Sequence, residues 1–190
     1  MKSIVFFFLL LLSIAKLNAQ ITYSSELDRK NGLKVFVFGY QKNMYEHLLS
    51  AKKLSNDGQA FGYGIFDPKP FDTVFYEYLG TEPNELFGVR WKKIILGFTK
   101  NQLTEIVIFW RDPVMSHYSF DNVLYGLQSV FGKTEKQPLP GDTFHYTWRG
   151  QNIYMSLSKS LQSTETTIFY KLYLRNTGLI QEIVDPKNQF

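Results

Sequence analysis

Runs in which apolar and polar side chains alternate at a spacing of two recur along this chain. Residues 86–98 and 103–110 are apolar-rich runs of strand type, and the polar residues 99–102 join them. Period-two alternation places one set of side chains on each face of a strand, and a short polar connection between two such runs indicates a hairpin. A second hairpin is predicted from residues 143–149 and 153–158. The chain is therefore expected to build an antiparallel sheet.

Other segments are also predicted to be strands. Residues 33–38 are apolar on both faces, which favours a place at the centre of the sheet. Residues 60–66, 71–79 and 166–175 have strand patterns, and glycines interrupt the first of them. In residues 103–110, the alternation assigns one face to Ile106, Ile108 and Trp110, and the other to Leu103, Glu105, Val107 and Phe109.

Two segments have helical spacing. Residues 43–54 form one apolar stripe, and residues 120–131 place apolar side chains at the i, i+3, i+4 and i+7 positions. Residues at their ends match known capping patterns. The expected caps are Asn43 with Glu46, Ser119 and Gly132. Residues 133–142 are expected to form a loop, and residues 176–190 are compatible with a helical turn or a strand.

This order of elements predicts an α+β domain, in which an antiparallel sheet of about eight strands carries two helices on one face. A run of strands follows each helix, which suggests a duplicated αβββ unit with halves at residues 33–110 and 119–175. The arrangement resembles the two-layer modules of the beta-lactamase-inhibitor-protein type and of small outer-membrane assembly lipoproteins. The resemblance rests on the element order and on the strand that ends at Phe38-Gly39 before a capped helix.

The first nineteen residues have the layout of a secretory signal peptide. Lys2 gives a positive start, residues 4–15 are apolar, and the small residue Ala19 stands at the expected cut. A membrane-spanning helix needs about 20 apolar residues, so this run is too short to span. The ending Asn-Ala-Gln resembles exported proteins of the Bacteroidetes. We expect cleavage after Ala19, a single domain over residues 20–190, and a location in the periplasm or outside the cell, with no membrane span.

Composition narrows the function. The formal net charge is +4, and part of it lies in the signal peptide, so the mature chain lacks the basic excess of a nucleic-acid-binding protein. The chain has no cysteine, which excludes disulfides, a lipid-anchored cysteine, cysteine zinc sites and thiol catalysis. A mature chain of about 170 residues is long enough to be held by its core alone.

No catalytic motif emerges from the remaining polar residues. His47, His117 and His145 are not at metal-ligand spacing, and the local grouping of Asp112, Ser116 and His117 is not the signature of a catalytic triad. Nothing in the sequence pairs an acid with a base among the carboxylates Asp72, Glu77, Glu82, Glu85 and Glu105. Gly62 and Gly64 lack the spacing of a phosphate loop. We therefore predict no catalytic residue, no cofactor and no metal site.

Aromatic residues make up 17% of the chain and fall largely on predicted strands. They either fill the core or form a sheet face that binds a protein, a glycan or a hydrophobic ligand. In the second hairpin Trp148 shares one side with Tyr146, and if that side packs, the side with His145, Thr147 and Arg149 is the candidate surface. The predicted function is a non-catalytic, exported binding module. The alternatives are a carboxylate-based hydrolase and a structural subunit of a surface assembly.

Overall fold

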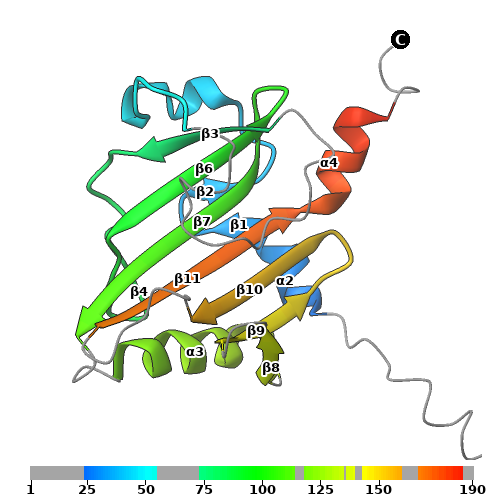
Figure 1. Cartoon of the computed structure of the whole chain (residues 1–190). Coiled ribbons are helices and arrows are strands. Elements are labelled where there is room, and N and C mark those ends of the chain that lie inside the picture. Colours follow the sequence, from blue (N-terminus) through cyan, green and yellow to red (C-terminus); the bar gives the residue numbers. More distant parts are fainter. Residues whose placement is uncertain are drawn as a thin grey trace, which may run out of the picture.

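A computed structural model describes residues 24–54, 73–113, 118–134, 136–139, 143–159 and 167–185. Seven strands form one antiparallel sheet, so the predicted α+β class and antiparallel sheet are confirmed (Figure 1). The strands lie side by side in the order β3 (Thr73–Tyr78), β6 (Lys93–Thr99), β7 (Gln102–Pro113), β11 (Thr167–Asn176), β10 (Ile153–Lys159), β9 (Thr143–Arg149) and β8 (Lys136–Leu139).

Two three-stranded meanders meet at the centre of this sheet. One is β3-β6-β7, the other is β9-β10-β11, and their last strands, β7 and β11, pair antiparallel from Pro113↔Thr167 to Glu105↔Arg175. The second predicted hairpin is confirmed as β9-β10. The residues expected to form a loop at 133–142 contain β8, which adds an edge strand beside β9, so that expectation was wrong.

Residues 33–38 do not form a central strand. They belong to a small separate hairpin of β1 (Gly32–Leu33) and β2 (Phe36–Val37), because Lys34 has a φ of 54° and turns the chain back. Similarly, a turn at Phe87, with a φ of 52°, separates β4 (Glu85–Leu86) from β5 (Val89–Arg90), so β6 begins only at Lys93. The predicted strand at residues 60–66 lies outside the described residues.

The β6-β7 hairpin is confirmed, with a two-residue turn at Lys100 and Asn101. Both residues have a positive φ, as the common tight hairpin turn requires. A bulge follows, because Phe98 pairs with Leu103 while Gly97 pairs with Glu105. The extra residue shifts the alternation by one position. Leu103 therefore packs in the same cluster as Ile106 and Ile108, and its predicted placement beside Glu105 was wrong.

The helix predicted at residues 43–54 is not formed. Two single 3-10 turns, η1 (Lys42–Met44) and η2 (Glu46–Leu48), occupy its first half. The chain then runs along the edge of the sheet, where the Leu54 N–H donates to the Phe75 carbonyl at 2.9 Å. The edge strand β3 offers this segment backbone hydrogen bonds that replace those of a helix. The pairing also covers the edge of the sheet, which would otherwise be open to association with another strand.

Three α-helices are present in the described part of the chain: α2 (Ser25–Lys30), α3 (Tyr118–Phe131) and α4 (Thr177–Val184). The predicted second helix is confirmed as α3, although it starts before Ser119, which is therefore not its cap. Gly132 ends the helix as expected. Its φ is 90°, and its N–H donates a hydrogen bond to the Gln128 carbonyl at 3.0 Å. Residues Thr177–Val184 of the tail form α4, and the Asn176 side chain caps this helix by accepting a hydrogen bond from the Leu179 N–H at 2.8 Å.

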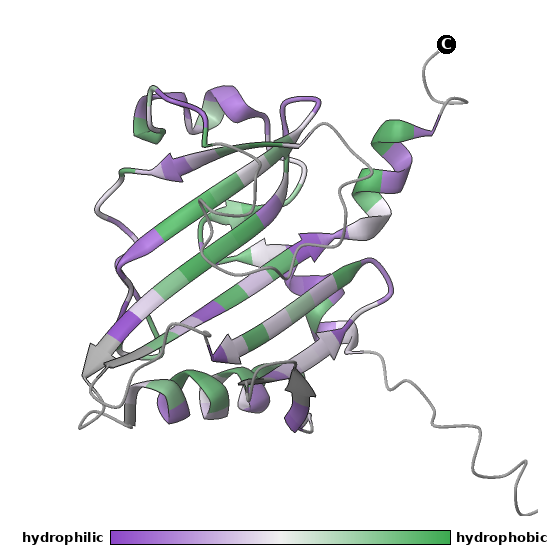
Figure 2. Cartoon of the chain, viewed as in Figure 1, coloured by the Kyte–Doolittle hydropathy of each residue, from purple (hydrophilic) through white to green (hydrophobic). Residues whose placement is uncertain are grey.

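Each side of the sheet carries a buried apolar cluster, and Figure 2 colours long stretches of β6 and β7 as hydrophobic. We call the side that packs with α2 and α3 the helix face; Figure 1 shows α2 and the β1-β2 hairpin behind the sheet. Leu27 of α2 and Leu127 of α3 belong to the large core cluster there. On the opposite side, which we call the second face, a smaller buried cluster contains Phe75, Ile95, Val107 and Tyr173.

Asp28 ties α2 to the turn between β9 and β10. Its carboxylate accepts hydrogen bonds from the backbone N–H groups of Gln151, Asn152 and Ile153, at 2.5, 2.9 and 3.0 Å. Hydrogen bonds to a charged acceptor are among the stronger ones in proteins. The helix layer is thereby anchored to the second meander. Within the described residues, no helix has the length and apolar character needed to cross a membrane.

Candidate ligand-binding site

The two described histidines lie on different elements. His47 is exposed in η2, while His145 is half-buried on β9, with its Nε2 2.9 Å from Oε1 of Gln137. Burial lowers the pKa of the His145 imidazole. Among the described residues, no three His, Asp or Glu side chains gather where a metal ion would fit. Outside the described residues lie His117, Ser116, Gly62, Gly64, Asp72 and the side chain of Asp112.

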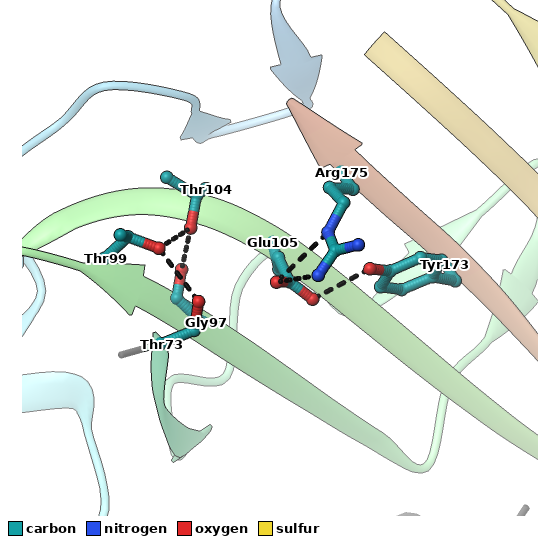
Figure 3. A network of polar contacts seen from close by, with 7 residues as sticks. All are labelled: Thr73, Gly97, Thr99, Thr104, Glu105, Tyr173 and Arg175. Carbon is teal, nitrogen blue, oxygen red and sulfur yellow. Dashed lines mark hydrogen bonds and ion pairs between the residues drawn. The ribbon is translucent and has the colours of Figure 1, made fainter. Parts of the chain in front are cut away.

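The structure gives two of the predicted carboxylates different basic partners. Glu77 lies 2.9 Å from the Lys93 ammonium on the neighbouring strand β6. Glu105 is almost completely buried on the second face, where Arg175 reaches its Oε1 at 3.1 Å and the Tyr173 hydroxyl donates to its Oε2 at 2.8 Å (Figure 3). The other two described candidates, Glu82 and Glu85, are exposed.

The network around Glu105 is well satisfied. Burial and the nearby Glu105 carboxylate raise the pKa of the Tyr173 hydroxyl, which keeps it protonated as a donor. Figure 3 also shows a chain of threonine hydroxyls beside it, in which Thr99 is 2.9 Å from both Thr73 and Thr104. Since these groups bond to one another, the arrangement fits a structural role in holding β3, β6, β7 and β11 together.

A cavity of about 390 Å³ lies on β6, β7 and β11, at the end away from the β6-β7 turn. Its described lining combines two properties that rarely meet in a structural core: positive charge and aromatic rings. No described lining residue is acidic. The lining consists of Lys92, Lys93, Phe109, Trp110, Arg111, Phe169, Tyr170 and Lys171.

Two similar tripeptides provide most of this lining. Phe109-Trp110-Arg111 on β7 runs antiparallel to Phe169-Tyr170-Lys171 on β11. In the observed register Phe109 pairs with Lys171, and Arg111 pairs with Phe169. Because side chains alternate along a strand, these four side chains share the second face while the central pair points to the helix face. Each phenylalanine therefore stands opposite a cation.

The central pair gives the site a rigid backing. Trp110 and Tyr170 are each 1% exposed, and their rings stack with centroids 5.1 Å apart and planes within 6° of each other. Phe120 of α3 meets Tyr170 edge-on at 5.4 Å, and the Trp110 Nε1 donates to the Val89 carbonyl at 3.4 Å. Contacts with α3 and β5 on the helix face thus hold in place β7 and β11, the two strands that carry most of the cavity lining.

The cations differ in their environments. Arg111 is exposed, and its guanidinium lies over the Phe169 ring at 5.4 Å from the centroid. Lys93 is half-buried and forms the ion pair with Glu77. Lys171 is only 4% exposed, and burial lowers the pKa of its ammonium to about 8. Placing a charge there is costly, because a low-dielectric surrounding disfavours the charged form.

A second cavity of about 190 Å³ lies near the β6-β7 turn, and two of its three lysines, Lys42 and Lys100, have protein contacts. Lys42 lies over the Tyr76 ring at 4.8 Å and 3.7 Å from a Glu46 oxygen, while the Lys100 ammonium donates to the Ile183 carbonyl at 3.1 Å. The last contact suits the carbonyl end of α4. The larger cavity is therefore the better candidate site.

The sequence analysis named the polar side of the second hairpin as its candidate surface and none of the residues that line the cavity. Trp148 is 3% exposed and its Nε1 donates to the Gly132 carbonyl at 2.7 Å, so the aromatic side of its hairpin packs. The polar side with His145 therefore lies on the second face, as does the cavity. The signal that would have found the site is the repeat of phenylalanine, aromatic residue and cation at residues 109–111 and 169–171.

Comparison of the chain with family profiles, with curated proteins and with solved structures finds no match.

Proposed function

We propose that this protein is an exported, non-catalytic binding protein that takes up a small organic anion with an apolar body. The observation that carries this proposal is the convergence of four cationic side chains and two phenylalanines on one cavity. Binding pockets of this kind combine apolar walls with a few polar groups that fix orientation. Here the polar groups are positively charged, so the ligand that complements them carries a negative charge.

The burial of Lys171 supports an anionic ligand. An ammonium that is 4% exposed lowers the stability of the folded protein, as its depressed pKa indicates. Proteins retain such unfavourable groups at sites where function requires them. An anion bound beside Lys171 and Arg111 would offset that cost by supplying the opposite charge in a poorly solvated place.

The binding proposal is tested with 2-naphthoate and its uncharged counterpart 2-naphthamide, using isothermal titration calorimetry. We expect 2-naphthoate to bind and 2-naphthamide to bind about ten-fold more weakly or worse, because a charge-assisted hydrogen bond contributes roughly 1.5–3 kcal/mol. Arg111→Gln is expected to weaken 2-naphthoate binding by a similar factor. The matched control is Arg29→Gln, since Arg29 is exposed on α2. Equal binding of acid and amide, or no binding of either, would contradict the proposal.

Export is the second part of the proposal. Its support is the positive start, the apolar run at residues 4–15 and the small residue Ala19. Mass spectrometry of the native protein from cell fractions is expected to find a chain that begins at Gln20 in the periplasmic or secreted fraction. A full-length chain in the cytoplasm would be the contrary result.

We also propose that the domain arose by duplication of a unit built on a three-stranded meander, although the helix predicted at residues 43–54 of the first unit is not formed. The two meanders are joined through their last strands, as a two-fold arrangement of two similar units requires. The matching tripeptides at residues 109–111 and 169–171 lie on those two strands and face each other. On this proposal, the ligand-binding cavity lies at the junction between the halves.

A further inference from the structure

The alternation of cations and phenylalanines restricts the kind of anion that fits the cavity. Phe109 and Phe169 occupy diagonal positions on β7 and β11, since Phe109 pairs with Lys171 and Phe169 with Arg111. Diagonal neighbours across an antiparallel pair lie about 7–8 Å apart. Aromatic rings interact at centroid separations of about 4.5–7 Å. A flat group that lies across these two positions is therefore within reach of both rings.

Arg111 adds a second constraint on shape. Its guanidinium lies over the Phe169 ring at 5.4 Å. A guanidinium is planar and binds a carboxylate through two parallel hydrogen bonds in its own plane. In an aryl carboxylate, conjugation favours a carboxylate that is coplanar with the ring. When its carboxylate binds Arg111, such a ligand therefore holds its flat ring in the plane of the guanidinium. A saturated ring is too thick to lie in the same way.

On these grounds, and resting on the proposed function of the cavity, we infer that the protein selects flat aromatic carboxylates over saturated carboxylates of the same size and charge. Phe109 and Phe169 determine the shape of the ligand, and Arg111 and Lys171 determine its charge. The stacked Trp110 and Tyr170 behind them prevent the strands from adjusting to a thicker ligand.

The test compares 2-naphthoate with decahydro-2-naphthoate, which has the same carbon skeleton and charge but no aromatic ring. Calorimetric titrations of the purified protein are expected to give 2-naphthoate a dissociation constant about ten-fold lower. Phe169→Leu is expected to reduce that ratio to about three-fold or less, while leaving the affinity for decahydro-2-naphthoate unchanged. Phe109→Leu serves as a second variant, and thermal melts verify that both variants fold.

The outcomes separate this inference from the proposed function. If both acids bind equally and Arg111→Gln weakens both, the preference for aromatic ligands is wrong while anion binding stands. If neither acid binds, the proposed function itself is wrong. If the preference is present but persists in both phenylalanine variants, the selection does not arise from these rings and the inference is overturned.

Discussion

Leu127→Asp is expected to abolish cooperative folding. Leu127 is fully buried on α3, within the large core cluster that joins that helix to the helix face of the sheet. Replacing it removes a buried aliphatic side chain and places a carboxylate in an apolar surrounding, which together cost about 5 kcal/mol or more. A loss of that size is comparable to the entire stability of a typical domain. Circular dichroism during thermal and urea unfolding measures the effect.

The control for this prediction is on the same helix. Tyr125 is 64% exposed, so Tyr125→Asp introduces the same charge without burying it. We expect that variant to melt within a few degrees of the wild type, since substitutions at exposed positions usually change stability little. If Leu127→Asp melted at the same temperature as Tyr125→Asp, the packing of α3 against the helix face through Leu127 would be wrong.

Local patterns in the sequence predicted the elements whose contacts are local. The hairpin β6-β7 and the helix α3 follow from alternation, helical spacing and the glycine after Phe131. Two of the failures share a different cause, because residues with a positive φ interrupt otherwise regular patterns. Lys34 and Phe87 each turn the chain where alternation alone predicts a continuous strand. Lysine and phenylalanine rarely adopt that conformation, so the sequence carries little sign of the turn at Lys34. The turn at Phe87 does carry one, because the next residue, Gly88 with a φ of 77°, is typical of tight hairpin turns.

The bulge at Thr104 shows a related limit. One extra residue reversed the predicted orientation of Leu103, while every residue from Glu105 onward kept its predicted face. Which strand lies beside which is also a non-local property. The site depends on the pairing of β7 with β11, whose matching tripeptides are separated by a helix and three other strands. Each tripeptide alone reads as an ordinary strand segment, and only their antiparallel pairing produces the alternation of cations and rings.

Lys171→Met is expected to make the protein more stable and to weaken anion binding. Burial lowers the pKa of Lys171 from 10.5 to about 8, so the unfolded chain binds this proton more tightly than the folded protein does. At pH 7 the difference corresponds to a destabilisation of up to about 3 kcal/mol. Methionine fills a similar volume without a charge, so the variant is expected to melt at a higher temperature. Lys133→Met, at an exposed position after α3, is the control.

The pH dependence of stability follows with a definite sign. Below pH 8 both states hold the proton, and the folded protein bears the full cost of the buried charge. Between about pH 8 and 10.5 the folded protein has released the proton while the unfolded chain retains it, so the stability of the wild type rises with pH. The greater stability of Lys171→Met over the wild type is therefore expected to disappear as the pH rises through this interval. Urea unfolding of both proteins at pH 7 and pH 10 measures that change.

Ligand binding is expected to respond to pH in the opposite direction. Raising the pH from 7 to 9 passes through the pKa of Lys171 and removes its charge from the cavity. The affinity of the wild type for 2-naphthoate should therefore fall over this interval by a measurable factor, whereas Lys171→Met binds weakly at both values. A variant that is stabilised yet binds 2-naphthoate as tightly as the wild type would show that Lys171 lies near the cavity without taking part in binding. In that case Arg111 would be left as the principal contact for the anion.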